Sequence, residues 1–327
     1  MRAYKTDNFM PFVPPKRIIK AMHLFRKRIS PVENLTFIAM MVAFDAILSL
    51  VSALVPFSAI FLMLLAPLTS AAVALFCRKR YIPLFLLAAL GIGIAVTAWD
   101  FLNTIFYLFP ALLTGTLYGL LWQWRVPSSL NIFVTSLLSL ALFYASIFLI
   151  KAILGGVDMI EVLLTLIRRQ GDPVARTIVP LFLYGYSLAQ TALSHAFLVT
   201  ELRHLDQEEP EEAIWPKWYP LFATLLLVSS LVTAFFHAKT AYFLFGLGAY
   251  WAVASAFALA PKIHPITIAL LVFALFGSVF LFAGVYRYMP PESGLLLLNA
   301  PLLLLTLASF LNPILIAHQK PKAPRYE

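Results

Sequence analysis

VENLTFIAMMVAFDAILSLVSALV, the run from Val32 to Val55, contains only two ionisable side chains, Glu33 and Asp45. A helix needs roughly 20 predominantly apolar residues to cross about 30 Å of hydrocarbon, so this run is long enough to span a bilayer. Only helices and closed barrels satisfy all their backbone hydrogen bonds in lipid. Because the run is continuously apolar and does not alternate like a barrel strand, it predicts a membrane-spanning helix.

Further runs of the same kind fill most of the chain, and they predict an all-α polytopic transmembrane helical bundle of about ten spans. Of the 327 residues, 61% are hydrophobic and 12% are charged, a composition that excludes a soluble fold of this length. Where only a few residues join two runs, as at Pro56 and Asp100, the spans are expected to be antiparallel neighbours. The predicted spans are 32–55, 57–76, 81–98, 101–122, 129–150, 174–200, 218–237, 241–260, 265–285 and 294–317.

The distribution of basic residues predicts the orientation of the chain. With the N-terminus inside, ten spans place 18 of the 24 Lys and Arg residues in cytoplasmic segments and the other 6 in outer ones. Both termini are therefore expected in the cytoplasm, and the predicted location is the bacterial cytoplasmic (inner) membrane, as a multi-pass protein. The net charge of +9 is explained by this topology, so nucleic acid is not expected as a partner. No cleavable signal peptide is expected, because a long basic segment precedes the first run.

The composition divides the chain into five segments. Residues 1–31 are basic and are expected to place an amphipathic helix on anionic membrane lipids, although these charges could also serve only to set the orientation. Residues 32–200 hold six spans, and 218–317 hold a four-span extension. Between them, 201–217 form an acidic cytoplasmic loop, either simply solvated or a partner-docking surface, and 318–327 form a cytoplasmic tail.

Asp45 shares one helix face with Ser49 and Ser52, because four and seven residues are close to whole numbers of helical turns. A carboxylate near the bilayer centre costs roughly 2.5 to 3.5 kcal/mol on insertion scales, so Asp45 is expected to face the protein interior. Two explanations stay open. A protonated Asp45 could hydrogen-bond a neighbouring helix, or the carboxylate could belong to a functional site.

Two later spans each carry a polar stripe along one side. Interhelical hydrogen bonds alone would explain either stripe, whereas a cavity open to the outside would bring both into contact with a small solute. His195 is either a proton-relay partner of Asp45 or an interhelical hydrogen-bond donor. The stripes consist of Asp100, Asn103, Thr104 and Tyr107, and of Tyr184, Ser187, Gln190, Thr191, Ser194 and His195. The candidate ligand-binding residues are Asp45, Ser49, Asp100, Asn103, Tyr107, Tyr184, Ser187 and Gln190.

A face of small side chains runs along the first span and consists of Ala39, Ala43 and Ala46. Small residues let helix backbones approach closely, so this face is a candidate for helix packing, either within the bundle or against a coupling partner. On the outer side, the connection 155–172 carries an apolar stripe opposite charged residues. That pattern predicts a short interfacial helix.

The sequence lacks the motifs that carry common enzyme chemistry. It contains no Walker-type loop, no His-Glu-x-x-His, no paired carboxylate motif and no Ser-His-Asp arrangement. Cys77 is the only cysteine, so a disulfide within the chain is excluded and a packing role is expected. We therefore expect no enzyme activity, no metal and no cofactor. The alternative hypothesis is an intramembrane enzyme that uses Asp45 and His195.

Three features of the N-terminal half occur together: a basic N-terminus, Ala39-x-x-x-Ala43 in the first span and Ala66-Pro67-Leu68 in the second. With them, the first six spans resemble the S components of energy-coupling-factor (ECF) vitamin transporters. The longer pattern adds Arg78-Lys79-Arg80-Tyr81, the stretch PALLTGTLYG at 110–119 and an extension after residue 200. It resembles the YybS-like family of uncharacterised membrane proteins over most of residues 30–317.

The resemblance implies a transport subunit that binds a small-molecule solute. In the S-component plan, the alanine face of the first helix contacts a coupling protein, which works with ATPase subunits, and the ligand binds in the outer half of a six-helix bundle. Carried over to this chain, the plan assigns coupling to Ala39 and Ala43. The four C-terminal spans depart from it, and the alternative is a membrane scaffold or assembly factor without a small-molecule ligand.

Overall fold

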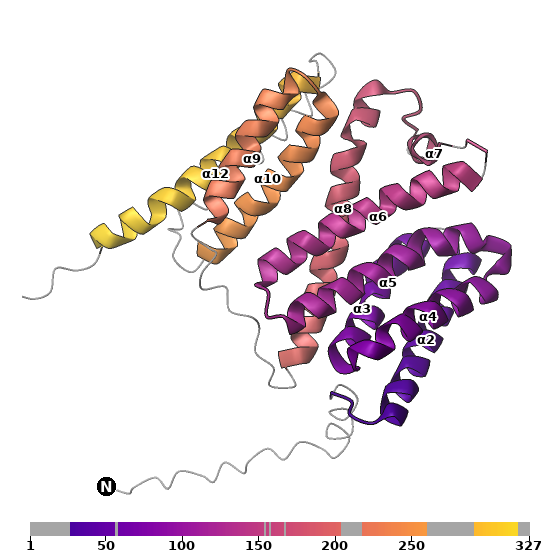
Figure 1. Cartoon of the computed structure of the whole chain (residues 1–327). Coiled ribbons are helices and arrows are strands. Elements are labelled where there is room, and N and C mark those ends of the chain that lie inside the picture. Colours follow the sequence, from indigo (N-terminus) through magenta and orange to yellow (C-terminus); the bar gives the residue numbers. More distant parts are fainter. Residues whose placement is uncertain are drawn as a thin grey trace, which may run out of the picture.

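The computed structural model describes residues 27–55, 58–153, 155–156, 158–166, 168–203, 218–259 and 291–319. Every secondary-structure element in these residues is an α-helix or a short 3-10 helix (Figure 1). The predicted all-α class is therefore confirmed for the described part of the chain. Three described helices are long and apolar enough to cross a membrane: Pro31–Leu54, Lys79–Val96 and Ser128–Ile153.

The predicted apolar runs coincide with helices wherever the structure describes them. One run, 265–285, lies outside the described residues, as do residues 1–26 of the basic segment, residues 204–217 of the acidic loop and residues 320–327 of the tail. The described α-helices are α2 (Pro31–Leu54), α3 (Ser58–Phe76), α4 (Ile82–Val96), α5 (Phe101–Gln123), α6 (Ser128–Ile153), α7 (Met159–Leu166), α8 (Pro173–Arg203), α9 (Tyr219–Ala234), α10 (Ala238–Leu259) and α12 (Pro291–Gln319).

The described helices form two groups that meet through α8 and α6. In the first group, α2, α3, α4 and α5 pack on one another, and α6 packs on α5. In the second, α9, α10 and α12 pack together, as the orange and yellow ribbons of Figure 1 show. α8 contacts α3 and α6 of the first group and α10 of the second. α6 also reaches the second group directly, because Phe133 stacks on Tyr250 of α10 with ring centroids 5.5 Å apart. The two groups therefore meet through both α8 and α6.

The start of α2 is fixed by its own sequence and by the loop after α3. Ser30 caps the helix, since its hydroxyl accepts from the Glu33 amide at 3.1 Å while the Glu33 carboxylate accepts from the Ser30 amide at 3.3 Å. Asn34, fully buried, donates to the Ser30 carbonyl at 2.7 Å and accepts from the Arg78 amide at 2.9 Å. This side chain therefore ties the first turn of α2 to the residues that follow α3.

Two glycines of α5 allow that helix to cross α3 in direct backbone contact. A Cβ atom on Gly115 would lie 2.0 Å from the Pro67 carbonyl oxygen, and one on Gly119 would lie 2.7 Å from the Cβ atom of Ala74. The two glycines are four residues apart and so lie on one helix face, as in the Gly-x-x-x-Gly contacts of membrane helices. The α3–α5 contact is thus closed to any larger side chain at these positions.

Cys77 comes directly after α3 and is 1% exposed, which confirms the predicted packing role. Burial raises the pKa of its thiol to about 11, and the nearby Arg28 guanidinium opposes that rise. At neutral pH the thiol is therefore protonated and shielded from reagents in the folded protein. As the only cysteine in the chain, it reports unfolding when a thiol-reactive dye gains access to it.

The short helix expected in the outer connection is also confirmed, as α7. Leu164 is buried on its inner side, whereas its charged side faces the start of α8. There Arg176 binds Asp158 at 3.0 Å and Glu161 at 3.1 Å. These exposed pairs hold α7 against α8 but each contributes little to stability.

Candidate functional site

Asp45 is fully buried in α2 and faces α3. One carboxylate oxygen, Oδ1, accepts a hydrogen bond of 2.8 Å from the Thr69 hydroxyl. The other, Oδ2, has no hydrogen-bond partner among the described residues. The predicted inward orientation of Asp45 is therefore confirmed, and half of its carboxylate lies buried without a partner.

The Asp45 cluster is a group of buried oxygen-bearing side chains at one level of the bundle. Ser49 and Ser52 lie on the same face of α2 as Asp45, as the helical spacing predicts, and both are buried. From α5, Tyr107 places its hydroxyl next to those of Ser49, Ser52 and Thr104, yet none of these completes a regular hydrogen bond to Tyr107 Oη. We define the cluster as Asp45, Ser49, Ser52, Thr69, Thr104 and Tyr107.

Gly93 of α4 brings a third helix close to the cluster. A Cβ atom at this position would lie 2.6 Å from Leu108 Cδ2 and 3.2 Å from Ser49 Oγ. One turn later, Thr97 donates to the Gly93 carbonyl at 2.8 Å, and its hydroxyl lies 2.5 Å from that of Thr104. The hydrogen bond between Thr97 and Thr104 thus joins the end of α4 to the first turn of α5 at the cluster.

No fixed positive charge accompanies Asp45 in the helices that surround it. The sequences of α2, α3, α4 and α5 contain no Lys, Arg or His. In α3, α4 and α5, the helices packed on α2, the only titratable side chains are Tyr107 and Tyr118. A buried carboxylate needs charge compensation, so the Asp45 cluster has to obtain it from a proton or from a bound ion.

The stripe on α8 forms a second polar group, and it faces α6. Gln190 Oε1 accepts from the Ser139 hydroxyl of α6 at 3.1 Å, and Thr191 donates to the Ser187 carbonyl of its own helix at 2.9 Å. The hydroxyls of Tyr184 and Ser187 are buried without a hydrogen-bond partner among the described residues. This stripe therefore takes part in helix–helix contact, the simpler of the two explanations open from the sequence.

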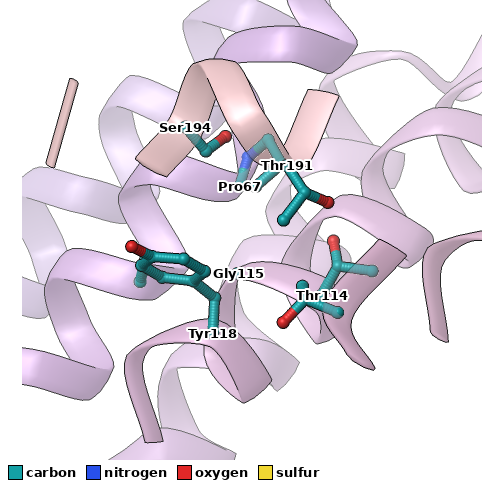
Figure 2. Close-up of a pocket in the computed structure, with 8 residues that line it drawn as sticks. Pro67, Thr114, Gly115, Tyr118, Thr191 and Ser194 are labelled. Atoms are coloured by element: carbon teal, nitrogen blue, oxygen red, sulfur yellow. The ribbon is translucent and has the colours of Figure 1, made fainter. Parts of the chain in front are cut away.

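A small cavity lies where α3, α5, α6 and α8 meet, and Figure 2 shows the labelled side chains around it. Its volume of about 10 Å³ is roughly what one water molecule needs. Its polar lining consists of Thr114, Tyr118, Thr135, Thr191 and Ser194. The cavity can hold a bridging water but not an organic solute.

His195 belongs to this second region of the bundle. Its Nδ1 atom lies 2.6 Å from the Tyr118 hydroxyl, and its ring packs on Tyr118 and Trp122. Tyr107 of the Asp45 cluster and Tyr118 are on the same helix, and their levels differ by roughly 16 Å at 1.5 Å per residue. That separation argues against direct proton transfer between Asp45 and His195, so the proton relay stays a prediction without geometric support.

The candidate ligand-binding residues thus fall into two groups. Asp45, Ser49 and Tyr107 come together in the Asp45 cluster, whereas Tyr184, Ser187 and Gln190 lie at the α6–α8 contact. Asp100 is partly exposed just before α5. The side chain of Asn103 lies outside the described residues.

The alanine face of α2 is open. Ala39 and Ala43 are exposed, and Ala46 is half-buried. Together with residues of α4 they line an apolar groove of about 600 Å³. The groove is lined by Leu35, Ile38, Ala39, Val42, Ala43, Ala46, Ile47, Leu84, Ala88 and Ile92. Of the two roles predicted for these alanines, packing inside the bundle does not apply to Ala39 and Ala43.

Thr69 and the glycine pair of α5 were not singled out from the sequence. Thr69 is an isolated polar residue two positions after Pro67 in an apolar run, and that interruption was a usable signal. The spacing Gly115-x-x-x-Gly119 was a second one. Neither signal names the partner, because only the packed structure places Thr69 opposite Asp45.

The chain matches no protein-family model, no curated protein and no solved structure.

Proposed function

We propose that the protein is a small-solute-binding subunit of a membrane transporter, similar in plan to an ECF S component and without enzyme activity of its own. In this proposal it crosses the bacterial cytoplasmic membrane about ten times with both termini inside. The observation that carries the proposal is the Asp45 cluster, because a buried carboxylate oxygen without a partner beside several hydroxyls offers polar contacts to a ligand. Such groups are rare inside membrane proteins and mark substrate or ion pathways.

A subunit of this kind also has to dock to a coupling partner, and the apolar groove on α2 and α4 offers a surface for that contact. Three alanines of α2 line it, and such small side chains let the backbone of another helix approach closely. The groove and the Asp45 cluster lie on different faces of the same helix. Docking of a coupling protein at the groove is therefore able to influence α2 without blocking the solute.

Replacing Ala43 with tryptophan tests the docking role. The indole would fill the groove without disturbing the core, because Ala43 is exposed. We expect the variant to fold normally and to lose most of the coupling and ATPase subunits that co-purify with the wild-type protein from its own membrane. The measurement is quantitative mass spectrometry of the purified complexes.

The matched control for that experiment is Ala192→Trp, which adds the same side chain to an exposed position of α8. It should retain the associated subunits. Equal recovery of those subunits with Ala43→Trp and with the wild type would contradict docking at the groove.

A second candidate function is a membrane scaffold without a small-molecule ligand. The observation that favours it is the α6–α8 contact, where polar side chains pair with each other and the adjacent cavity has room for one water only. Under this alternative, the Asp45 cluster would tie helices together through the Thr69 hydrogen bond. Absence of any retained organic solute, with partners still bound, would favour the scaffold.

A further inference from the structure

We propose that the Asp45 cluster is a sodium-binding site, in which the Asp45 carboxylate neutralises the ion and neighbouring hydroxyl oxygens complete its coordination. This inference concerns the same cluster as the proposed function, and it adds an ion that would bind at Asp45 whether or not a solute binds beside it. Three features of the cluster favour sodium: the missing counter-charge, the orientation of the Ser49 and Thr104 hydroxyl hydrogens and the tight packing around Ser49.

The missing counter-charge sets the charge of the ligand. Asp45 is the single carboxylate of the cluster, and the helices around it carry no basic side chain. One monovalent cation brings the buried site to neutrality, whereas a divalent ion would leave a net positive charge in a medium of low dielectric constant. Calcium sites in addition draw on several oxygen ligands that usually include more than one carboxylate.

Thr69 donates its hydroxyl hydrogen to Asp45 Oδ1, but the hydroxyl hydrogens of Ser49 and Thr104 are engaged elsewhere than at the Asp45 carboxylate. Ser49 donates its hydroxyl hydrogen to the Asp45 backbone carbonyl at 2.8 Å. Toward any other neighbour, Ser49 Oγ can therefore act only as an acceptor. Thr97 donates to Gly93, so the hydrogen between Thr97 and Thr104 comes from Thr104. The oxygen atoms of Ser49 and Thr104 therefore have lone pairs to offer and no free hydrogen. Such oxygen atoms are suitable ligands for a hard cation.

A proton on Asp45 explains the arrangement of the cluster less well than a bound cation does. A protonated Oδ2 would be a buried donor, and this atom has no hydrogen-bond partner in the described part of the chain. Tyr107 Oη, likewise without a hydrogen-bond partner in the described part of the chain, lies beside the hydroxyls of Ser49 and Ser52, which share the Asp45 face of α2. A cation between oxygen atoms of this kind engages both of them at once.

The packing around Ser49 favours a small ion. A Cβ atom on Gly93 would already lie 3.2 Å from Ser49 Oγ, so α4 approaches the cluster closely. A dehydrated sodium ion requires less space than potassium. We therefore expect sodium and lithium to bind and potassium to bind more weakly.

The test is a cation titration of the full-length protein purified in detergent, with unfolding followed by dye labelling of Cys77. Sodium chloride is exchanged against N-methyl-D-glucamine chloride at constant ionic strength, and potassium and lithium chlorides are run in parallel. Binding to the folded state only should raise the apparent melting temperature in a saturable way, by roughly 5 °C. Asp45→Asn should remove this dependence on sodium.

Two further variants protect the test against misfolding of Asp45→Asn. Tyr107→Phe and Ser52→Ala each remove one oxygen atom and should raise the half-saturating sodium concentration at least about ten-fold. The control is Ser146→Ala, which deletes another buried hydroxyl without a partner, on α6, a helix that packs on α5 and not beside Asp45. It should leave the half-saturating concentration unchanged.

A melting temperature that is the same in sodium and in N-methyl-D-glucamine would overturn the proposal. So would a sodium response that Asp45→Asn and Tyr107→Phe leave intact, or stabilisation that follows acidification alone and is indifferent to the cation, since that result would assign a proton to Asp45. Failure of the proposed transport function would be seen differently. In that case no organic solute or coupling subunit is retained, while the sodium response persists.

Discussion

Replacement of Gly115 by alanine is expected to destabilise the protein by about 3 kcal/mol, because a single methyl group would enter the α3 backbone. The added Cβ atom would lie 2.0 Å from the Pro67 carbonyl oxygen and 2.1 Å from Ser70 Oγ, so α3 and α5 would have to separate. The apparent melting temperature in detergent should fall by roughly 6 to 12 °C, or the variant should fail to accumulate in the membrane. Dye labelling of Cys77 against temperature measures this change.

The control is Gly185→Ala on α8, where no atom lies within 4 Å of the added Cβ. Alanine has the higher helix propensity, so this variant should be at least as stable as the wild type. If Gly115→Ala has the same melting temperature as the Gly185→Ala control, the close contact between α3 and α5 does not exist in the protein.

Replacement of Asn34 by leucine has the second largest expected effect on the fold. Leucine is similar in size but removes the acceptor of the Arg78 amide and the donor to the Ser30 carbonyl. The Arg78 amide would lose this partner at the junction of α2 with the end of α3, whereas the Ser30 carbonyl would keep only the backbone amide of residue 34, which donates to it at 3.2 Å. We expect a cost of about 2 kcal/mol. The melting temperature should therefore fall by roughly 4 to 8 °C in the same labelling experiment.

Thr36→Ala serves as the comparison for Asn34→Leu, because Thr36 is exposed on the same helix two residues away. Its melting curve should overlay that of the wild type. Should Asn34→Leu be as stable as Thr36→Ala, the junction would have to be held by other contacts, such as the hydrogen bond of 2.8 Å from the Arg28 amide to the Phe76 carbonyl.

The sequence predicts the helices well because the physical requirement behind them is local. A long, continuously apolar run favours a helix, and α3 at Ser58–Phe76 and α5 at Phe101–Gln123 begin and end close to the predicted limits. The same local periodicity predicts that Asp45, Ser49 and Ser52 share one buried face of α2. These predictions need no knowledge of neighbouring helices.

The pairing of helices is not predictable by the same reasoning. A polar stripe shows which residues lie on one side of a helix, but it does not show what they contact. In the structure, Gln190 of α8 meets Ser139 of α6, and Tyr107 of α5 lies beside Ser49 and Ser52 of α2. Likewise, three alanines on one face fit both a packed and an open surface. Which polar residues belong to the Asp45 cluster and which to the α6–α8 contact is decided by long-range contacts, and these depend on the whole chain.

Native mass spectrometry of the protein purified from its own membrane tests the central claim, that buried polar groups around Asp45 bind a small solute. We expect an organic adduct on the wild type and on Ser146→Ala, and no such adduct on Asp45→Asn and Tyr107→Phe. A spectrum that shows only the bare chain and lipids for the wild type, or an adduct that both cluster variants retain, would contradict it.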